Sequence, residues 1–189
     1  MAKSPSEMVT ISVPKEITEI YFAAKAAILF LEVKEEFTSN EAAIEIRDCL
    51  DHLMLAFANS SDPEKMEAQS NGAIEHLRRA SIEPYELAVE NKLAKIIKRQ
   101  TWRWWHIFLF IPNTKNDAQT KLLRSIKRKI FEGRQCKNLA RWKEGIKLFQ
   151  DAYEECLTLE KIVPHQGTIF SRLFSIILAA ISFLAGWLI

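Results

Sequence analysis

Residues 38–57 read TSNEAAIEIRDCLDHLMLAF, and this stretch contains both the start and the inner face of an amphipathic helix. Its first four residues, Thr38 to Glu41, form a capping box, the pattern that satisfies the free N–H groups at the beginning of a helix. Apolar residues then recur at steps of three and four, which is the period of one helix face. We expect a helix ending near Phe57, with an inner face formed by Ala42, Ile46, Cys49 or Leu50, Leu53 and Phe57.

The segments on either side repeat the helical pattern. Pro14 suits the first turn of a helix, and apolar residues at helical spacing follow it up to Leu31. Ser61-Asp62-Pro63-Glu64 is a further start signal, with a capping side chain, a first-turn proline and an acid. The helix that it opens meets Pro84, which either kinks the helix or begins a new one.

A basic helical stretch runs from Asp117 to about Leu159, and we expect it to be interrupted or bent near Gly133. No alternating strand pattern of useful length accompanies these helices. The predicted fold class is therefore all-α, a helical bundle over residues 14–160 that follows an N-terminal tail of residues 1–13.

The composition disfavours several classes of protein. Five Gly and six Pro among 189 residues argue against an all-β fold, which needs many tight turns. The three cysteines show no paired spacing, so we predict neither a disulfide framework nor a metal site, and reduced thiols are typical of the cytosol. The chain has no glycine-rich phosphate loop and no nucleophile elbow, and the first residues lack the apolar region of a secretory signal. We expect no cofactor and disfavour a metabolic enzyme.

The net charge of +2 hides a strong asymmetry along the chain. Residues 1–90 carry 8 Lys and Arg against 17 Asp and Glu, so the part of the bundle within 14–90 is acidic. Residues 91–148 carry 16 basic against 3 acidic residues. This basic region calls for an anionic partner: lipid headgroups, RNA or a nucleoprotein, or the acidic half of the same chain.

Residues 168–189 predict a membrane helix that follows a linker at 161–167. From Leu173 to Ile189 there are 17 residues without a charge, which span about 25 Å as a helix. Arg172 and Trp187 suit the two membrane–water interfaces. We therefore expect a single-pass tail anchor in a lipid bilayer, most consistent with a bacterial inner membrane, with the bundle in the cytoplasm. The alternative is a buried core helix.

One face of this segment carries small or polar residues at steps of three and four: Arg172, Ser175, Ala179, Ser182 and Gly186. In lipid, such a stripe lets helices approach closely and hydrogen-bond to each other. The stripe predicts a homo-oligomer, and in a larger ring it would line a narrow polar pore.

Residues 101–112 are rich in aromatic side chains and flanked by basic ones. The aromatic residues are Trp102, Trp104, Trp105, Phe108 and Phe110. Tryptophan prefers the headgroup level of a bilayer, so we interpret this segment as a membrane-interface element. Two alternatives stay open: a bulky connector in the core, and a surface that stacks bases of single-stranded RNA.

Arg47-Asp48-Cys49-Leu50-Asp51-His52 has the pattern R-[N/D/H]-x-x-x-H, and at this motif the chain resembles the HEPN superfamily of all-α domains. The resemblance implies a metal-independent ribonuclease in which Arg47 and His52 are catalytic and Asp48 orients them. The alternative from the residues alone is a polar layer between two similar helices. Asp51–His52 and Glu75–His76 would form that layer, with Arg47 in surface ion pairs.

The layout is also similar to membrane-bound accessory proteins of RNA-targeting CRISPR systems, which join a degenerate HEPN-like domain to a membrane segment. Three hypotheses follow. The first is an oligomerising membrane effector or accessory protein of bacterial phage defence, acting by assembly or pore formation. The second is a membrane-tethered HEPN-like ribonuclease. The third is a non-catalytic tail-anchored adaptor that binds a nucleic-acid-bound partner through residues 91–148.

Overall fold

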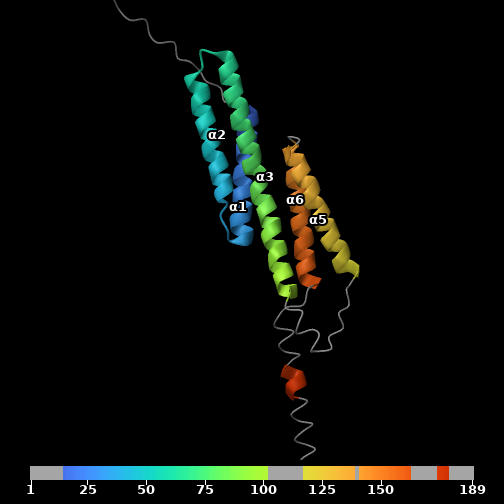
Figure 1. Cartoon of the computed structure of the whole chain (residues 1–189). Coiled ribbons are helices and arrows are strands. Elements are labelled where there is room, and N and C mark those ends of the chain that lie inside the picture. Colours follow the sequence, from blue (N-terminus) through green and yellow to red (C-terminus); the bar gives the residue numbers. More distant parts are fainter. Residues whose placement is uncertain (1–14, 102–116, 139–140, 163–173, 179–189) are drawn as a thin grey trace, which may run out of the picture.

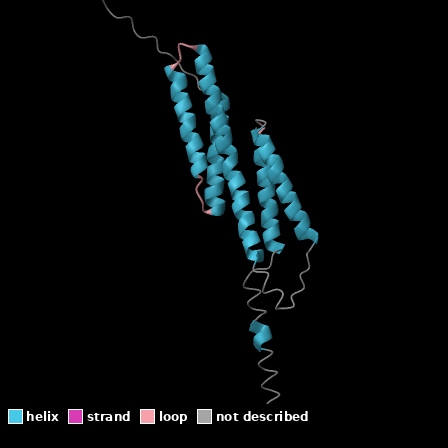
Figure 2. Ribbon diagram, in the orientation of Figure 1, coloured by secondary structure: helices cyan, strands magenta, loops and turns pink. Residues whose placement is uncertain are grey.

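The computed structural model describes residues 15–101, 117–138, 141–162 and 174–178. Every regular element in these ranges is a helix, and no strand occurs in them (Figure 2). The predicted all-α fold class is therefore confirmed. The helices are α1 (Lys15–Glu35), α2 (Asn40–Ala58), α3 (Pro63–Thr101), α5 (Asp117–Asn138) and α6 (Trp142–Ile162).

Helix α3 is the central element of the bundle. It has 39 residues and is about 58 Å long, nearly twice the length of any other helix described. In Figure 1 its first half lies beside α2 and its second half beside α5 and α6, while α1 runs along its middle. Helix α1 is parallel to α3, because Arg78 of α3 pairs with Glu16 near the start of α1 and Lys95 pairs with Glu35 at its end.

Two hydrophobic cores form along α3. In the first, α1, α2 and α3 contribute Ile17, Ile20, Cys49, Ala73 and Leu77. The second core joins the end of α1 and the second half of α3 to α5 and α6, with Leu31, Val89, Ile126, Phe149 and Leu159 among its buried residues. Trp142 packs against both cores. A single bundle therefore results, in which α3 is shared.

Helix α3 passes through Pro84 without a break, so the expectation of a new helix at this proline was wrong. A proline inside a helix costs about 3 kcal/mol, because one hydrogen bond is lost and the ring meets the preceding turn. The side chains around it, Ile82 and Val89, are almost fully buried, and each stabilises the helix by about 1.5–3 kcal/mol. Tertiary packing therefore outweighs the local penalty.

The break in the basic stretch also differs from the expectation. Helix α5 continues through Gly133 to Asn138, and α6 begins at Trp142. Gly133 is buried, and a Cβ atom added to it would lie 2.9 Å from the ring of Phe149. This glycine therefore permits close contact between α5 and α6 and does not bend the helix.

Helix α2 starts one residue later than the capping box predicts. Ser39 is its N-cap and accepts a hydrogen bond from the N–H of Ala42 at 3.1 Å. The buried positions are Ala42, Cys49 and Ala56, whereas Leu50 and Phe57, expected on the inner face, are 57% and 40% exposed. The small buried residues recur every seven positions and let α2 pack closely on α3. The larger side chains of Leu50 and Phe57 remain partly exposed to solvent.

Most of the predicted membrane segment lies outside the described residues. Residues 174–178 form a short helical stretch whose side chains are all exposed. Among the helices that the structure describes, none has both the length and the apolar character needed to cross a bilayer.

The close contact at Gly133 gives a stability prediction. Gly133→Ala is expected to lower the free energy of unfolding by about 1–3 kcal/mol, because the buried ring of Phe149 has no room to move aside. Gly145→Ala is the matched control on the facing helix, where the new Cβ has its nearest contacts at 3.4 Å. It is expected to gain up to about 1 kcal/mol from helix propensity. Denaturant unfolding checks both, and a Gly133→Ala variant as stable as the native chain contradicts the prediction.

Candidate functional site

Three helix ends meet at one end of the bundle, which we call the tether end. Helix α3 ends there at Thr101, α5 begins there at Asp117 and α6 ends there at Ile162 (Figure 1). Both the aromatic segment and the C-terminal apolar segment are therefore attached to the bundle at the tether end. The sequence alone did not predict this convergence, because it depends on α3 and α6 running in the same direction.

A buried carboxylate joins three helices near the tether end. The side chain of Glu35 is 1% exposed. The hydroxyl of Tyr153 donates to its Oε1, and the ammonium of Lys95 donates to its Oε2, each at 2.7 Å. Burial and the adjacent Glu35 raise the pKa of Tyr153 above its ordinary value. These contacts connect the end of α1 to α3 and α6, and Glu36 then leaves the helix with a positive φ of 54°.

Much of the basic region pairs with acidic residues of other helices. On α5, Arg134 bonds both Glu86 and Glu90 of α3, and the hydrogen bond with Glu86 is the main reason that its pKa is raised. Further pairs between helices include Lys92–Glu160, Lys129–Glu155, Lys137–Glu83 and Lys143–Glu19. The sequence left open which anionic partner the basic region binds. The structure shows that acidic residues of the same chain pair with several of its basic residues.

Four of the basic residues outside these pairs lie on the first half of α5, next to the tether end. Lys121, Arg124 and Lys127 are exposed and take part in no ion pair within the described ranges. Arg128 is paired only with Glu132 on its own helix, at 3.7 Å. A cationic surface therefore lies on the end of the bundle to which both apolar segments are attached.

The predicted catalytic residues occupy two different environments on α2. Arg47 is 67% exposed and pairs with its neighbour Asp48 at 2.7 Å, which raises the pKa of the guanidinium. His52 lies about 140° further around the helix and faces α3. Its Nδ1 lies 2.6 Å from Oε1 of Gln69. The structure therefore pairs Arg47 with Asp48, and no hydrogen bond or ion pair among the described residues joins either of them to the imidazole of His52.

His52 belongs to a half-buried polar layer between α2 and α3. Its ring stacks on that of His76 with 5.1 Å between the centroids, and Nδ1 of His76 lies 2.7 Å from Glu45. Gly72 makes room for the layer, because a Cβ there would lie 2.8 Å from the ring of His52. The polar-layer alternative thus describes both histidines, although their partners are Gln69 and Glu45 and not Asp51 and Glu75. Within the described ranges, no group of three or more metal-ligating side chains is present.

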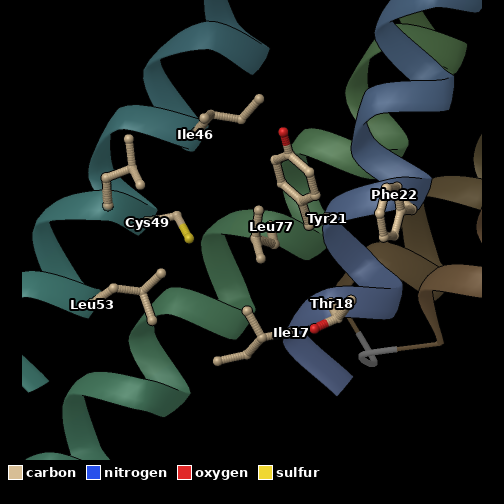
Figure 3. A pocket seen from close by; sticks show the side chains of 9 residues that line it. Ile17, Thr18, Tyr21, Phe22, Ile46, Cys49, Leu53 and Leu77 are labelled. Carbon is tan, nitrogen blue, oxygen red and sulfur yellow. The ribbon is translucent and has the colours of Figure 1, made fainter. Parts of the chain in front are cut away.

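An apolar groove lies between α1 and α2, and the sequence interpretation missed it. Its volume is about 250 Å³. In Figure 3, Ile46 and Cys49 of α2 lie on one side of the gap and Tyr21 of α1 on the other, with Leu77 of α3 between them. Burial raises the pKa of the Cys49 thiol, so this cysteine is an unreactive packing residue. Ile17 and Tyr21 of the groove belong to the apolar repeat that the sequence shows in α1, but nothing in that repeat indicates that a gap remains between α1 and α2.

The remaining predicted site residues lie outside the described ranges, with one exception. Ser175 of the small-residue stripe falls in the exposed stretch 174–178. The others are Trp102, Trp104, Trp105, Phe108, Phe110, Arg172, Ala179, Ser182, Gly186 and Trp187.

Neither family profiles, nor curated proteins, nor solved structures give a match to this chain. Its function is therefore argued from its own charges, apolar faces and topology.

The contact between Gly72 and His52 gives a coupled prediction. Gly72→Ala is expected to destabilise the chain by about 1–3 kcal/mol, because the new methyl group displaces the ring of His52. In a His52→Ala background the same change should be neutral or stabilising, because the obstructing ring is gone and alanine favours a helix. Arg47→Ala, on the exposed face, should change stability by no more than about 0.5 kcal/mol. Denaturant unfolding of the four variants measures the coupling, and equal effects of Gly72→Ala in both backgrounds contradict the polar layer.

Proposed function

We propose that this chain is a membrane-tethered helical effector or accessory protein whose bundle stands in the cytoplasm on a C-terminal membrane helix. Residues 168–189 form the anchor, and the aromatic segment 101–112 lies at the interface of the same bilayer. The observation that supports this most strongly is the tether end, where both segments are attached beside the cationic first half of α5.

The charges favour an anionic bilayer over a neutral one. Basic residues close to an anionic membrane surface each add about 1 kcal/mol of attraction. Lys121, Arg124 and Lys127 are not used in ion pairs of the described bundle, so they remain able to bind headgroups. On the second half of α5, Lys129, Arg134 and Lys137 are occupied by pairs with other helices, which argues against an extended nucleic-acid surface along the whole of α5.

The small-residue stripe of the anchor supports self-association in the membrane, and a ring of such helices would permeabilise it. The resemblance to CRISPR accessory proteins suggests bacterial phage defence as the setting, with the inner membrane as the target. In this proposal the bundle receives a signal or a partner and sets the oligomeric state. The ribonuclease and adaptor hypotheses are the alternatives that the experiments below separate.

Vesicle flotation tests the tether. The full chain is expected to float with vesicles of anionic phosphatidylglycerol, and deletion of residues 168–189 should abolish stable flotation. The double charge reversal Lys121→Glu with Arg124→Glu should lower binding to anionic vesicles and leave binding to neutral phosphatidylcholine unchanged. The matched control reverses two exposed basic residues that lie away from the tether end and, like Lys121 and Arg124, take part in no ion pair within the described ranges; this variant, Lys15→Glu with Lys147→Glu, should bind as the native chain does. Flotation of the deletion variant, or equal effects of the two reversals, contradicts the proposal.

Expression in bacteria separates the three hypotheses. For the effector, deletion of 168–189 removes toxicity, whereas Arg47→Ala with His52→Ala leaves it intact if circular dichroism shows a folded chain. For the ribonuclease the two outcomes are reversed, and RNA cleavage is lost with the histidine and arginine. For the adaptor, neither the native chain nor either variant is toxic, and charge reversal in residues 121–143 loses the partner.

A further inference from the structure

Helix α1 has a second apolar face that packs against nothing in the described bundle. Its inner face, which includes Ile20, Ala24 and Leu31, is buried against α3. On the opposite side lie Phe22, Ala26, Leu29 and Val33, which we call the outer seam. Phe22, Leu29 and Val33 are 60%, 49% and 74% exposed. Such a continuous exposed apolar surface on a folded domain marks an interaction site.

The spacing of the outer seam indicates that another helix covers it. Its residues follow one another at steps of four, three and four, the a/d repeat of a coiled coil. A narrow stripe of this kind fits the seam of two paired helices, whereas a helix that lies on a lipid surface presents a wider apolar face. The seam also continues into the apolar groove, because Phe22 lines both.

The charges beside the seam identify the occupant as a second copy of this chain. Lys25 and Glu32 lie on the same flank of the outer seam, both are exposed, and no ion pair within the described ranges includes either of them. When two copies of α1 pair antiparallel about a two-fold axis, the same flanks face each other. Lys25 of each copy then lies opposite Glu32 of the other, which gives two reciprocal ion pairs.

The same register also matches the sizes of the apolar side chains. Antiparallel pairing centred between Ala26 and Leu29 sets the small residue against the large one in two layers, and sets Phe22 against Val33 in the outer two. A parallel pair would instead bring Lys25 toward Phe30, which packs against Tyr85 and Tyr153 in the core of its own chain. At each end of the paired seams, Glu19 of one copy faces Glu36 of the other. Lys143 of the same chain already pairs with Glu19, so this pair offsets the repulsion between the two glutamates.

We infer that the outer seam of α1 is a homodimer interface in which two chains pair antiparallel through Phe22, Ala26, Leu29 and Val33, with Lys25–Glu32 pairs beside them. The interface belongs to the bundle itself and holds whether or not residues 168–189 enter a bilayer. In the dimer the two tether ends point in opposite directions, so both anchors reach one membrane when the dimer lies flat along it. The interface is thus distinct from self-association of the anchors.

Disulfide cross-linking of the full chain in detergent tests the pairing and its direction. Two differently tagged copies, one with Lys25→Cys and the other with Glu32→Cys, are expected to cross-link to each other under mild oxidation. Glu32→Cys alone should not cross-link, because antiparallel pairing separates its two copies by about 13 Å along the helix axis. A mixture of Lys25→Cys with Lys34→Cys, on a different face of α1, is the second control. The native cysteines are buried, so the unmodified chain supplies the background.

Charge exchange supplies an independent readout. Lys25→Glu alone is expected to weaken dimerisation about fivefold in sedimentation equilibrium, and Lys25→Glu with Glu32→Lys should restore it. Leu29→Asp should weaken dimerisation at least about tenfold. Absence of the Lys25→Cys/Glu32→Cys cross-link in chains whose helix content is unchanged, or a double exchange no better than the single one, overturns the inference. Cross-linking of Glu32→Cys to itself also overturns it, because that requires another register.

Discussion

The burial of α3 against four other helices is the constraint on which the rest of the bundle depends. Its residues from Ala73 to Ile96 supply part of both cores, and Pro84 lies in an unbroken helix between Ile82 and Tyr85 of the second core. Because one rigid helix is shared, α1 and α6 are held parallel to it and to each other. This common direction places the ends of α3 and α6 and the start of α5 together, and thereby creates the tether end.

Charge complementarity fixes how the second half of the chain sits on the first. Arg134 and Lys137 of α5 reach three glutamates of α3, while Glu35 binds Lys95 and Tyr153 from two other helices. The exposed pairs of Arg134 contribute little each, so they select the register more than they stabilise the bundle, whereas the Glu35 carboxylate is buried. The cations that these pairs leave over lie toward the tether end. The basic residues of the sequence are therefore divided between ion pairs inside the bundle and an exposed cationic surface.

Local signals in the sequence were enough to predict the all-α class and the starts of α2 and α3, because a cap and a first-turn proline act within a few residues. The passage through Pro84 and the role of Gly133 were beyond sequence reasoning, since both depend on side chains distant in the chain. For the same reason the sequence suggested a polar layer at His52 but gave it the wrong partners. The outer seam was missed because periodicity was assigned to one face of α1 only, and the groove was missed because a gap between two helices depends on how they pack.

The depth of two tryptophans relative to the bilayer tests the central claim most directly. Trp142 begins α6, about 30 Å along that helix from the tether end, and Trp187 lies in the proposed anchor. In chains that keep one of the two and carry Phe at the other tryptophan positions, brominated lipids in the vesicle should quench the fluorescence of Trp187 strongly and that of Trp142 little. Quenching of Trp142 alone, or of neither residue in vesicle-bound chain, would contradict a bundle tethered to the bilayer by its C-terminal segment.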